Sequence, residues 1–261
     1  MTTYRNYSRA DYEKEFQAEL DKKAPDVEWM EFLGLFDWQQ SQHIGIIGPT
    51  GSGKTYLSVF LLTMRDYVVV LATKPYDETV DKLVNEEFYV LWRKWQDRPA
   101  EYFPRRVIWP DAKDLFSQHR QRKEFTQALS DIYRSGGWCV FVDELWYLIH
   151  QLKMEREVKT YLLQARSNNI SLVGCSQRPA WIPVEMFDQP EHLFFFRDND
   201  ERNLKTISGI SWLSANLVRA LVARLRPYQF LYIHTRSGLM YRSTAPGGED
   251  KKSTSKKKGG D

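Results

Sequence analysis

Short apolar runs alternate with charged or amphipathic segments along most of the chain, as in a sheet of buried parallel strands joined by helices. Six runs have the β-branched or aromatic composition of such strands, at residues 43–47, 67–72, 107–109, 138–142, 170–176 and 192–196. The segments between and after them predict helices, at residues 55–62, 77–96, 112–134, 145–167, 198–207 and 211–225. Two last runs, at 229–234 and 239–241, flank a Ser-Gly turn and predict a closing hairpin. The pattern predicts an α/β fold with a mostly parallel sheet flanked by helices.

Both ends of the chain depart from this alternation. Residues 1–40 predict an extension with a helix from about Asp11 to Lys22, whose apolar side fits either the core or a neighbouring subunit. An apolar cluster follows and is expected to cover an edge of the sheet, at Trp29, Phe32, Leu33, Leu35, Phe36 and Trp38. Residues 244–261 are rich in Gly, Ser, Thr and Lys and predict a disordered tail. This leaves residues 41–243 as the α/β domain.

Charge and composition narrow the possible partners only a little. The formal net charge of the chain is +3, and five lysines and three acids after residue 248 contribute +2 of it. The body is therefore about neutral, and composition is no evidence for nucleic acid. Arg120, Arg122 and Lys123 are interpreted as a solvated helix face. Cys139 and Cys175 lie in predicted strands and fit the core of a reduced protein. No apolar run reaches the ~18 residues that cross a bilayer, so we expect a soluble chain without a membrane segment.

The segment GPTGSGKT fills the pattern G-x-x-x-x-G-K-[ST] between a predicted strand and a predicted helix, which is the context that a phosphate-binding loop requires. Its backbone N–H groups and the N-terminus of the helix favour a polyphosphate. Lys54 is expected to reach the β- and γ-phosphates of ATP, and the Thr55 hydroxyl to bind Mg²⁺. The predicted nucleotide-binding residues are Gly48, Pro49, Thr50, Gly51, Ser52, Gly53, Lys54 and Thr55.

Polar residues follow two more of the predicted strands, at the edge where open α/β sheets bind ligands. Asp143 and Glu144 come after the run at 138–142, and Gln177 after the run at 170–176. Asp143 is expected to bind Mg²⁺ and Glu144 to polarise a water molecule for attack on the γ-phosphate. Gln177 is expected to contact that water and the γ-phosphate. Each of these residues would also be ordinary at the polar end of a strand.

Together these segments resemble the FtsK/HerA superfamily of DNA-pumping ATPases, and most closely the DNA-packaging ATPases of double-stranded DNA viruses and phages. The resemblance rests on GPTGSGKT, WCVFVDE, QARSNNISLVGCSQRP and RPYQFLYIHTRSGLMYR. It implies a RecA-like (ASCE) P-loop core in which the strand before Gln177 lies between the other two site strands. It also implies a ring of subunits with ATP at their interfaces, and Arg166 acting in the site of a neighbour. Arg197 and Arg178 are the next candidates for that role, and Arg166 would also suit a helix C-terminus as a cation.

The resemblance favours an ATP-driven motor that moves double-stranded DNA, packaging a viral genome into a capsid. Such a motor implies a pentameric or hexameric ring, a partner at the capsid portal, and a location in the host cytoplasm or on the virion. Alternatives in the same superfamily are filamentous-phage extrusion and conjugative DNA transfer. A P-loop kinase and a nucleotide-gated scaffold without hydrolysis are disfavoured, because neither needs Glu144 beside Asp143 or the sensor Gln177. The chain lacks the membrane segments and the winged-helix domain of FtsK itself.

Overall fold

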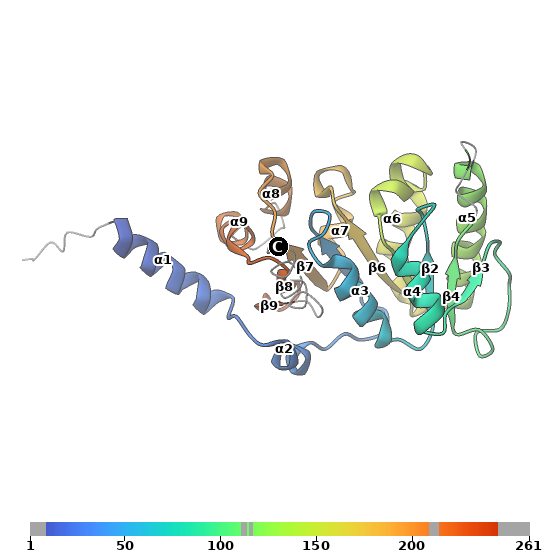
Figure 1. The fold of residues 1–261 in the computed structure, drawn as a ribbon, viewed down its shortest axis with the longest axis horizontal. Helices are drawn as coiled ribbons and strands as arrows, with labels where there is room; N and C mark the ends of the chain where they lie inside the picture. Colours follow the sequence, from blue (N-terminus) through green and yellow to red (C-terminus); the bar gives the residue numbers. More distant parts are fainter. Residues whose placement is uncertain (1–8, 111–113, 115–116, 209–213, 245–261) are drawn as a thin grey trace, which may run out of the picture.

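The computed structural model describes residues 9–110, 114, 117–208 and 214–244. Within these residues, nine strands form one sheet in the order β3-β4-β2-β5-β6-β1-β7-β8-β9 (Figure 1). The strands are β1 (Ile44–Ile47), β2 (Val68–Leu71), β3 (Val90–Trp92), β4 (Arg105–Ile108), β5 (Cys139–Val142), β6 (Ser171–Ser176), β7 (His192–Phe196), β8 (Gln229–His234) and β9 (Met240–Thr244). The pairs from β3 to β7 are parallel, and β8 and β9 add an antiparallel hairpin. The predicted fold class is confirmed.

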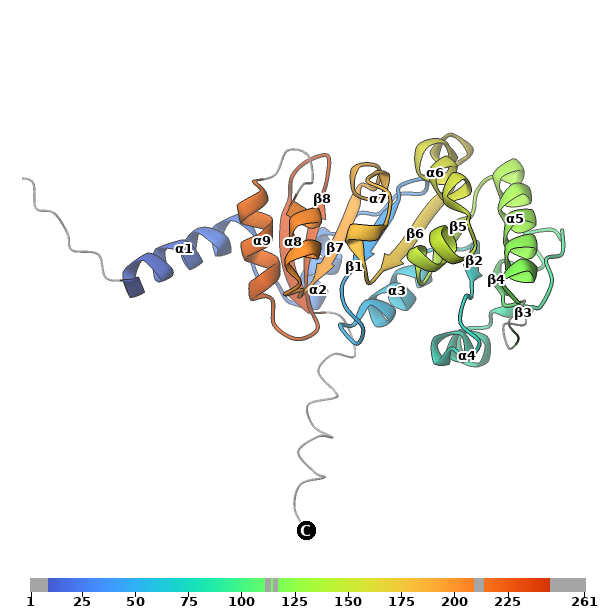
Figure 2. The same ribbon diagram turned by 90° about the horizontal axis from the view of Figure 1, so that it is seen from above.

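Helices cover both faces of the sheet (Figure 2). They are α1 (Arg9–Lys23), α2 (Trp29–Leu35), α3 (Lys54–Thr63), α4 (Glu78–Glu86), α5 (Ser117–Ser135), α6 (Glu155–Gln164), α7 (Glu185–Asp188), α8 (Glu201–Ser208) and α9 (Ala215–Arg224). Three short turns of other helix types complete them: η1 (Tyr147–Gln151), η2 (Ala165–Asn168) and η3 (Pro179–Trp181).

Alternating strand residues divide the core into two layers, because successive side chains of a strand point to opposite faces. Val68 and Val70 belong to the apolar cluster that contains residues of α2, α3 and α4. Val69 and Leu71 belong to the cluster that contains residues of α5, α6, α8 and α9. Both faces of the central strands are therefore buried, which explains their nearly continuous apolar sequences.

The strand β6 lies between β1 and β5, as the resemblance implied. Because all three are parallel, their carboxyl ends meet at one edge of the sheet. Ile47 pairs with Ser176, and Val142 pairs with Gly174. The segments that leave these strands therefore start side by side.

The helix expected at residues 77–96 is wrong beyond Glu86. Here α4 ends, Phe88 adopts a positive φ of 59°, and β3 follows as a new edge strand. Tertiary packing overrides the helical pattern: the buried Arg106 guanidinium of β4 lies 4.6 Å from the ring centre of Trp92 and 5.6 Å from that of Trp95. These cation–π contacts hold the segment against the sheet.

The other predicted elements are found with shifted ends. The predicted helix at 112–134 is observed as α5, and residues 111–113, 115 and 116 lie outside the described part. The helix expected at 211–225 is observed as α9, with residues 209–213 outside it. The segment 145–167 divides into η1, α6 and η2. Cys139 and Cys175 are buried and free.

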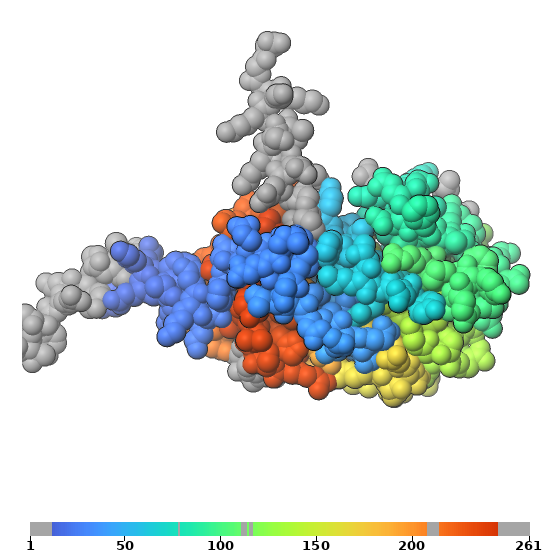
Figure 3. Space-filling model, turned by 90° about the horizontal axis from the view of Figure 1, so that it is seen from below, coloured from blue at the N-terminus to red at the C-terminus, as the bar shows by residue number. Residues whose placement is uncertain are grey.

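The N-terminal segment behaves in two ways. Figure 3 shows α1 projecting beyond the body, whereas α2 lies against it. Two backbone hydrogen bonds join residues 25–27 to Arg242 of β9. The N–H of Val27 donates to the Arg242 carbonyl, and the N–H of Arg242 donates to the Pro25 carbonyl. The domain boundaries at residues 40 and 243 remain a prediction, and residues 245–261, most of the predicted disordered tail, lie outside the described residues.

Among the helices described, none combines the length and the apolar character that crossing a membrane requires.

The helix α2 is held by an aromatic cluster. Phe32 is fully buried, and its ring lies 5.1 Å from Phe230, 5.2 Å from Tyr232 and 6.1 Å from Phe194, all edge-on. Edge-to-face pairs of this kind stabilise beyond the burial of area. Phe32 and Phe36 of the predicted apolar cluster thus pack on β7 and β8, whereas Leu35 is exposed.

We expect Phe32→Ala to lower the free energy of unfolding by about 3–5 kcal/mol, because it removes a buried ring and leaves a cavity. Urea denaturation followed by circular dichroism measures this. Met30→Ala, on the same helix but 74% exposed, is the control and should change stability by less than about 0.5 kcal/mol. Equal effects of the two substitutions would contradict the packing described for α2.

Candidate nucleotide-binding site

The loop from Gly48 to Gly53 connects β1 to the N-terminus of α3. Gly51 and Gly53 have φ angles of 75° and 110°, in the region that favours glycine. A Cβ on Gly48 would lie 2.6 Å from the Cβ of Phe196, so only glycine fits there. The hydroxyl of Ser52 is buried with no hydrogen-bond partner in the described residues. The loop therefore has the backbone of an anion cradle and one polar atom ready for a ligand.

Lys54 begins α3 and is almost completely buried, with 6% of its surface exposed. Its ammonium group donates hydrogen bonds to the carbonyls of Gly48 (2.7 Å) and Pro49 (2.8 Å). Burial lowers the pKa of Lys54 despite the nearby Asp143 and Glu144 carboxylates. The loop therefore holds the Lys54 ammonium through its own carbonyls, and the nearby carboxylates offset only part of the cost of burying that charge.

Asp143 and Glu144 follow β5 at the same edge of the sheet. Burial raises the pKa of Glu144, although the Trp146 N–H, which donates to it at 3.3 Å, and the Lys54 ammonium act in the opposite direction. Glu144 is thus a partly desolvated carboxylate close to Lys54.

Gln177 follows β6 and connects that strand to the phosphate-binding loop. Its side-chain oxygen accepts a hydrogen bond of 2.6 Å from the hydroxyl of Thr50 in the loop. The N–H of Gly48 donates to the carbonyl of Ser176 at 3.2 Å. The end of β6 is therefore bonded directly to the phosphate-binding loop, and the predicted residues after β1, β5 and β6 lie at one site.

Arg166 does not lie at this site. It precedes β6 and therefore lies at the amino edge of the sheet, where it pairs with Glu191 (2.7 Å) and donates to the carbonyl of Gln189 (2.9 Å). Arg178 follows β6 at the carboxyl edge, with its guanidinium 5.3 Å from the ring centre of Trp146. Arg197 follows β7 at the same edge and is exposed.

Sequence reasoning missed Lys74, which forms an ion pair with Asp143 and lies 3.7 Å from Asp77. Partial burial alone would lower the pKa of Lys74, but attraction to Asp143, Asp77 and Glu144 raises it. Lys74 follows the buried strand β2, so its place at a strand's carboxyl end was visible in the sequence. The adjacency of β2 to β5 was not.

Gln121 of α5 was also missed. It is fully buried, its amide donates to the carbonyl of Thr73 (2.9 Å), and its carbonyl oxygen accepts from the hydroxyl of Tyr147 (2.8 Å). Its bonds join α5 to the segments that follow β2 and β5. A glutamine on a charged helix carries no sequence signal for such a role.

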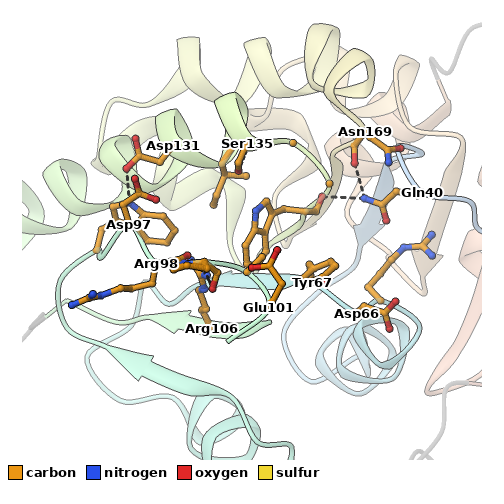
Figure 4. A pocket seen from close by; sticks show the side chains of 18 of the residues that line it. Gln40, Asp66, Tyr67, Asp97, Arg98, Glu101, Arg106, Asp131, Ser135 and Asn169 are labelled. Atoms are coloured by element: carbon orange, nitrogen blue, oxygen red, sulfur yellow. Dashed lines mark hydrogen bonds between the residues drawn. The ribbon is translucent and has the colours of Figure 1, made fainter. Parts of the chain in front are cut away.

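A cavity of about 980 Å³ lies at the opposite edge of the sheet, lined by residues that precede strands, such as Tyr67, Trp138 and Asn169 (Figure 4). Its walls carry the mixed charges of Arg98 and Glu101 and no phosphate-binding loop. The volume of a cavity therefore does not identify the candidate nucleotide site. The phosphate-binding loop and the carboxyl ends of β5 and β6 identify it.

No family model matches the chain. Over 172 residues the chain is 28% identical to the DNA packaging ATPase P9 of Enterobacteria phage PRD1. The aligned residues cover 64% of this chain and 69% of that protein. The predicted resemblance to the DNA-packaging ATPases of phages is confirmed. The fold is similar to the genome packaging NTPase B204 of Sulfolobus turreted icosahedral virus 2 in complex with AMPPCP, with a TM-score of 0.56, 16% identity and coverage of 77% and 96% of the two chains. It is also similar to VirB4 of Thermoanaerobacter pseudethanolicus, with a TM-score of 0.58, 10% identity and coverage of 80% and 90%.

The two lysines should affect stability in opposite directions. The lowered pKa of Lys54 means that folding disfavours its charge, so Lys54→Met should raise the free energy of unfolding at pH 7. The raised pKa of Lys74 stabilises the fold below the unfolded-state pKa of lysine, and this stabilisation is lost as the pH rises through the folded value. Lys74→Met should therefore destabilise at pH 7, by less than about 1 kcal/mol because solvent screens the pair.

Urea denaturation without nucleotide measures both effects. Melting at pH 7 gives an independent ranking of the two variants. A shift of both variants in the same direction would contradict the electrostatic difference between the two lysines.

Proposed function

We propose that this chain hydrolyses ATP to ADP and phosphate and uses the energy to move double-stranded DNA into a viral capsid. The observation that carries the proposal is the convergence of Lys54, Glu144 and Gln177 at the ends of three adjacent parallel strands. Phage PRD1 P9 is a DNA packaging ATPase, and the similarity to it supports the extension from ATP hydrolysis to DNA.

The loop would hold the triphosphate through its backbone N–H groups, the Lys54 ammonium and the Ser52 hydroxyl. The complex of B204 with AMPPCP supports ATP as the nucleotide. In hydrolysis, a water oxygen bonds to the γ-phosphorus, the bond to the β–γ bridging oxygen breaks, and ADP leaves with that electron pair. Glu144 accepts the proton of the water, and Gln177 orients the water toward the γ-phosphate.

Mg²⁺ fits the residues present. Thr55 and Asp143 offer a hydroxyl and a carboxylate, the hard oxygen ligands that Mg²⁺ prefers, and Mg²⁺ commonly takes one or two protein ligands together with substrate phosphates. The described residues contain no cluster of three or more His, Cys, Asp or Glu side chains that could hold a metal ion. When bound, the ion neutralises charge on the β- and γ-phosphates. Lys74 holds the carboxylate of Asp143 and would compete with the ion for it.

A ring of subunits would give Arg166 a role. It lies at the edge of the sheet opposite to its own loop, so it can serve only the site of a neighbour. There its charge would stabilise the transition state, typically by ~10³–10⁵ in rate. Arg178 and Arg197 remain the alternatives. We propose a ring of five or six subunits that meets a portal of the capsid, in the host cytoplasm or on the virion.

The alternatives are weaker on specific grounds. Extrusion of a filamentous phage or conjugative transfer has support only from the VirB4 likeness, which at 10% identity concerns the fold. A P-loop kinase would leave the partly desolvated Glu144 and the bond between Thr50 and Gln177 without a purpose.

Linear duplex DNA should stimulate ATP hydrolysis by the full chain several-fold. Salt should weaken this response, because salt cations compete with the cationic side chains of the protein for the DNA phosphates and reduce the gain from counterion release. Phosphate release measured with and without DNA, over a range of salt concentrations, tests the proposal. A kinase would be identified instead if DNA left the rate of ATP hydrolysis unchanged at every salt concentration and phosphate were transferred to a small acceptor.

Glu144→Gln should bind ATP with nearly unchanged affinity and lose turnover by ~10²–10⁴, because the amide cannot accept the proton. Since burial raises the pKa of Glu144, kcat of the unmodified chain should fall on acidification at a higher pH than an exposed glutamate would give. Fluorescent-nucleotide binding and a kcat–pH profile check both points. Glu31→Gln, an exposed change on α2, is the control. Normal turnover in Glu144→Gln would remove it from the role of base.

A further inference from the structure

The outer face of α5 is basic. His119, Arg122, Lys123 and Arg134 lie along it at helical spacing, and they line a hollow of about 580 Å³. In the described part of the chain, neither Arg122 nor Lys123 forms an ion pair, whereas Arg134 pairs with Asp131. Polar residues fill the positions between them, at Thr126, Gln127 and Ser130.

The two acids of α5 both bond to one tryptophan. Of the two, only Asp131 also lines the hollow, where it pairs with Arg134. Glu124 accepts the backbone N–H of Trp95 at 2.7 Å, and Asp131 accepts its indole N–H at 2.6 Å. The neighbouring helix α6 adds Arg156 and Glu157, which line a smaller cavity together with Arg134. Figures 1 and 2 both show α5 beside α6, at the end of the sheet away from α1.

This surface suits a phosphate backbone better than a protein partner. Protein interfaces are centred on aromatic or aliphatic anchors, and none of the large apolar side chains that are exposed in the described residues belongs to α5. Flexible cations interleaved with hydroxyl and amide groups are the usual ligands of DNA phosphates. From His119 to Arg134 the face extends ~22 Å at 1.5 Å per residue, enough to meet several phosphates.

The inner face of the same helix contacts the segments that follow β2 and β5, which carry residues of the candidate site. Gln121, next to Arg122, bonds to the carbonyl of Thr73, the residue before Lys74. It also accepts the hydroxyl of Tyr147, whose backbone N–H donates to the Glu144 carbonyl at 3.2 Å. One buried amide therefore joins α5 to the segments that carry both residues of the Lys74–Asp143 pair and Glu144.

We propose that α5 links DNA to hydrolysis: Arg122 and Lys123 bind backbone phosphates of the duplex, and Gln121 transmits that contact to the ends of β2 and β5. This inference rests on the proposed function and names the surface that contacts its DNA. Arg122 and Lys123 are binding residues in it, and Gln121 is a positioning residue. In this proposal Arg122 and Lys123 bind DNA, in place of the solvated role expected from the sequence.

The first test compares Arg122→Ala/Lys123→Ala with the unmodified chain. Fluorescence anisotropy of a labelled linear duplex gives the affinity, and phosphate release gives the stimulation. We expect the Kd for DNA to rise about tenfold or more, and the slope of log K against log salt to become shallower by about 2, since two phosphate contacts are lost. Arg122→Lys/Lys123→Arg should preserve both quantities.

The matched control is Lys22→Ala/Lys23→Ala, which removes the same charge from the exposed end of α1. It should leave DNA affinity and the salt slope within about twofold of the unmodified values. An equal loss in the control would show that net charge alone matters, and would overturn the assignment to α5.

The second test is Gln121→Met, which keeps the length of the side chain and removes its hydrogen bonds. DNA affinity should be unchanged, while the ratio of DNA-stimulated to DNA-free turnover should fall toward 1. A merely structural role would lower the melting temperature and leave this ratio intact. Tyr147→Phe, which deletes one of the two bonds, should lower the ratio in the same direction by a smaller amount.

The outcomes separate the inference from the proposed function. If DNA stimulates the unmodified chain but binds Arg122→Ala/Lys123→Ala as tightly, the α5 assignment is wrong and the packaging function stands. If that variant keeps its DNA affinity but forms smaller assemblies by mass, the face contacts a second copy of the chain, and the inference is again overturned. If the unmodified chain neither binds nor responds to DNA at any salt concentration, both proposals fail.

Discussion

Parallel pairing of β1, β6 and β5 is the constraint on which the rest of the structure depends. Neighbouring strands lie ~4.8 Å apart, so three adjacent carboxyl ends cover about 10 Å, the scale of a triphosphate. The register sets Ile47 beside Ser176 and Val142 beside Gly174. Because of this register the loop, Gln177 and the Asp143–Glu144 pair need no long side chains to converge.

This convergence opposes stability at the site itself. Burial disfavours the charge of both Lys54 and Glu144, as their shifted pKa values indicate. Groups of this kind are tolerated when surrounding structure holds them in position. Two apolar layers on the faces of the sheet, and the aromatic cluster of α2 with β7 and β8, supply that support away from the site. The candidate site thus carries charges that burial disfavours, on a base that two apolar layers support.

The two edges of the sheet have different characters, and this difference connects the proposals. The carboxyl edge holds the predicted nucleotide-binding residues and, through Gln121, the inner face of α5. The amino edge holds Arg166 with Glu191. In a ring, one edge would act on the subunit's own nucleotide and the other on a neighbour's. Because α5 would contact DNA on one side and the segments after β2 and β5 on the other, DNA binding could influence ATP hydrolysis.

The sequence by itself determined the class of fold, the phosphate-binding loop and the identity of the polar residues after three strands. These features are local: a Gly-rich turn before a helix, or an acid after an apolar run, is visible over a few residues. Tertiary structure alone decided that residues 90–92 form an edge strand, because Trp92 and Trp95 gain more from packing on Arg106 than from continuing a helix. It alone paired Lys74 with Asp143 and Gln121 with Thr73, since the order of strands in a sheet depends on long-range packing that no local pattern records.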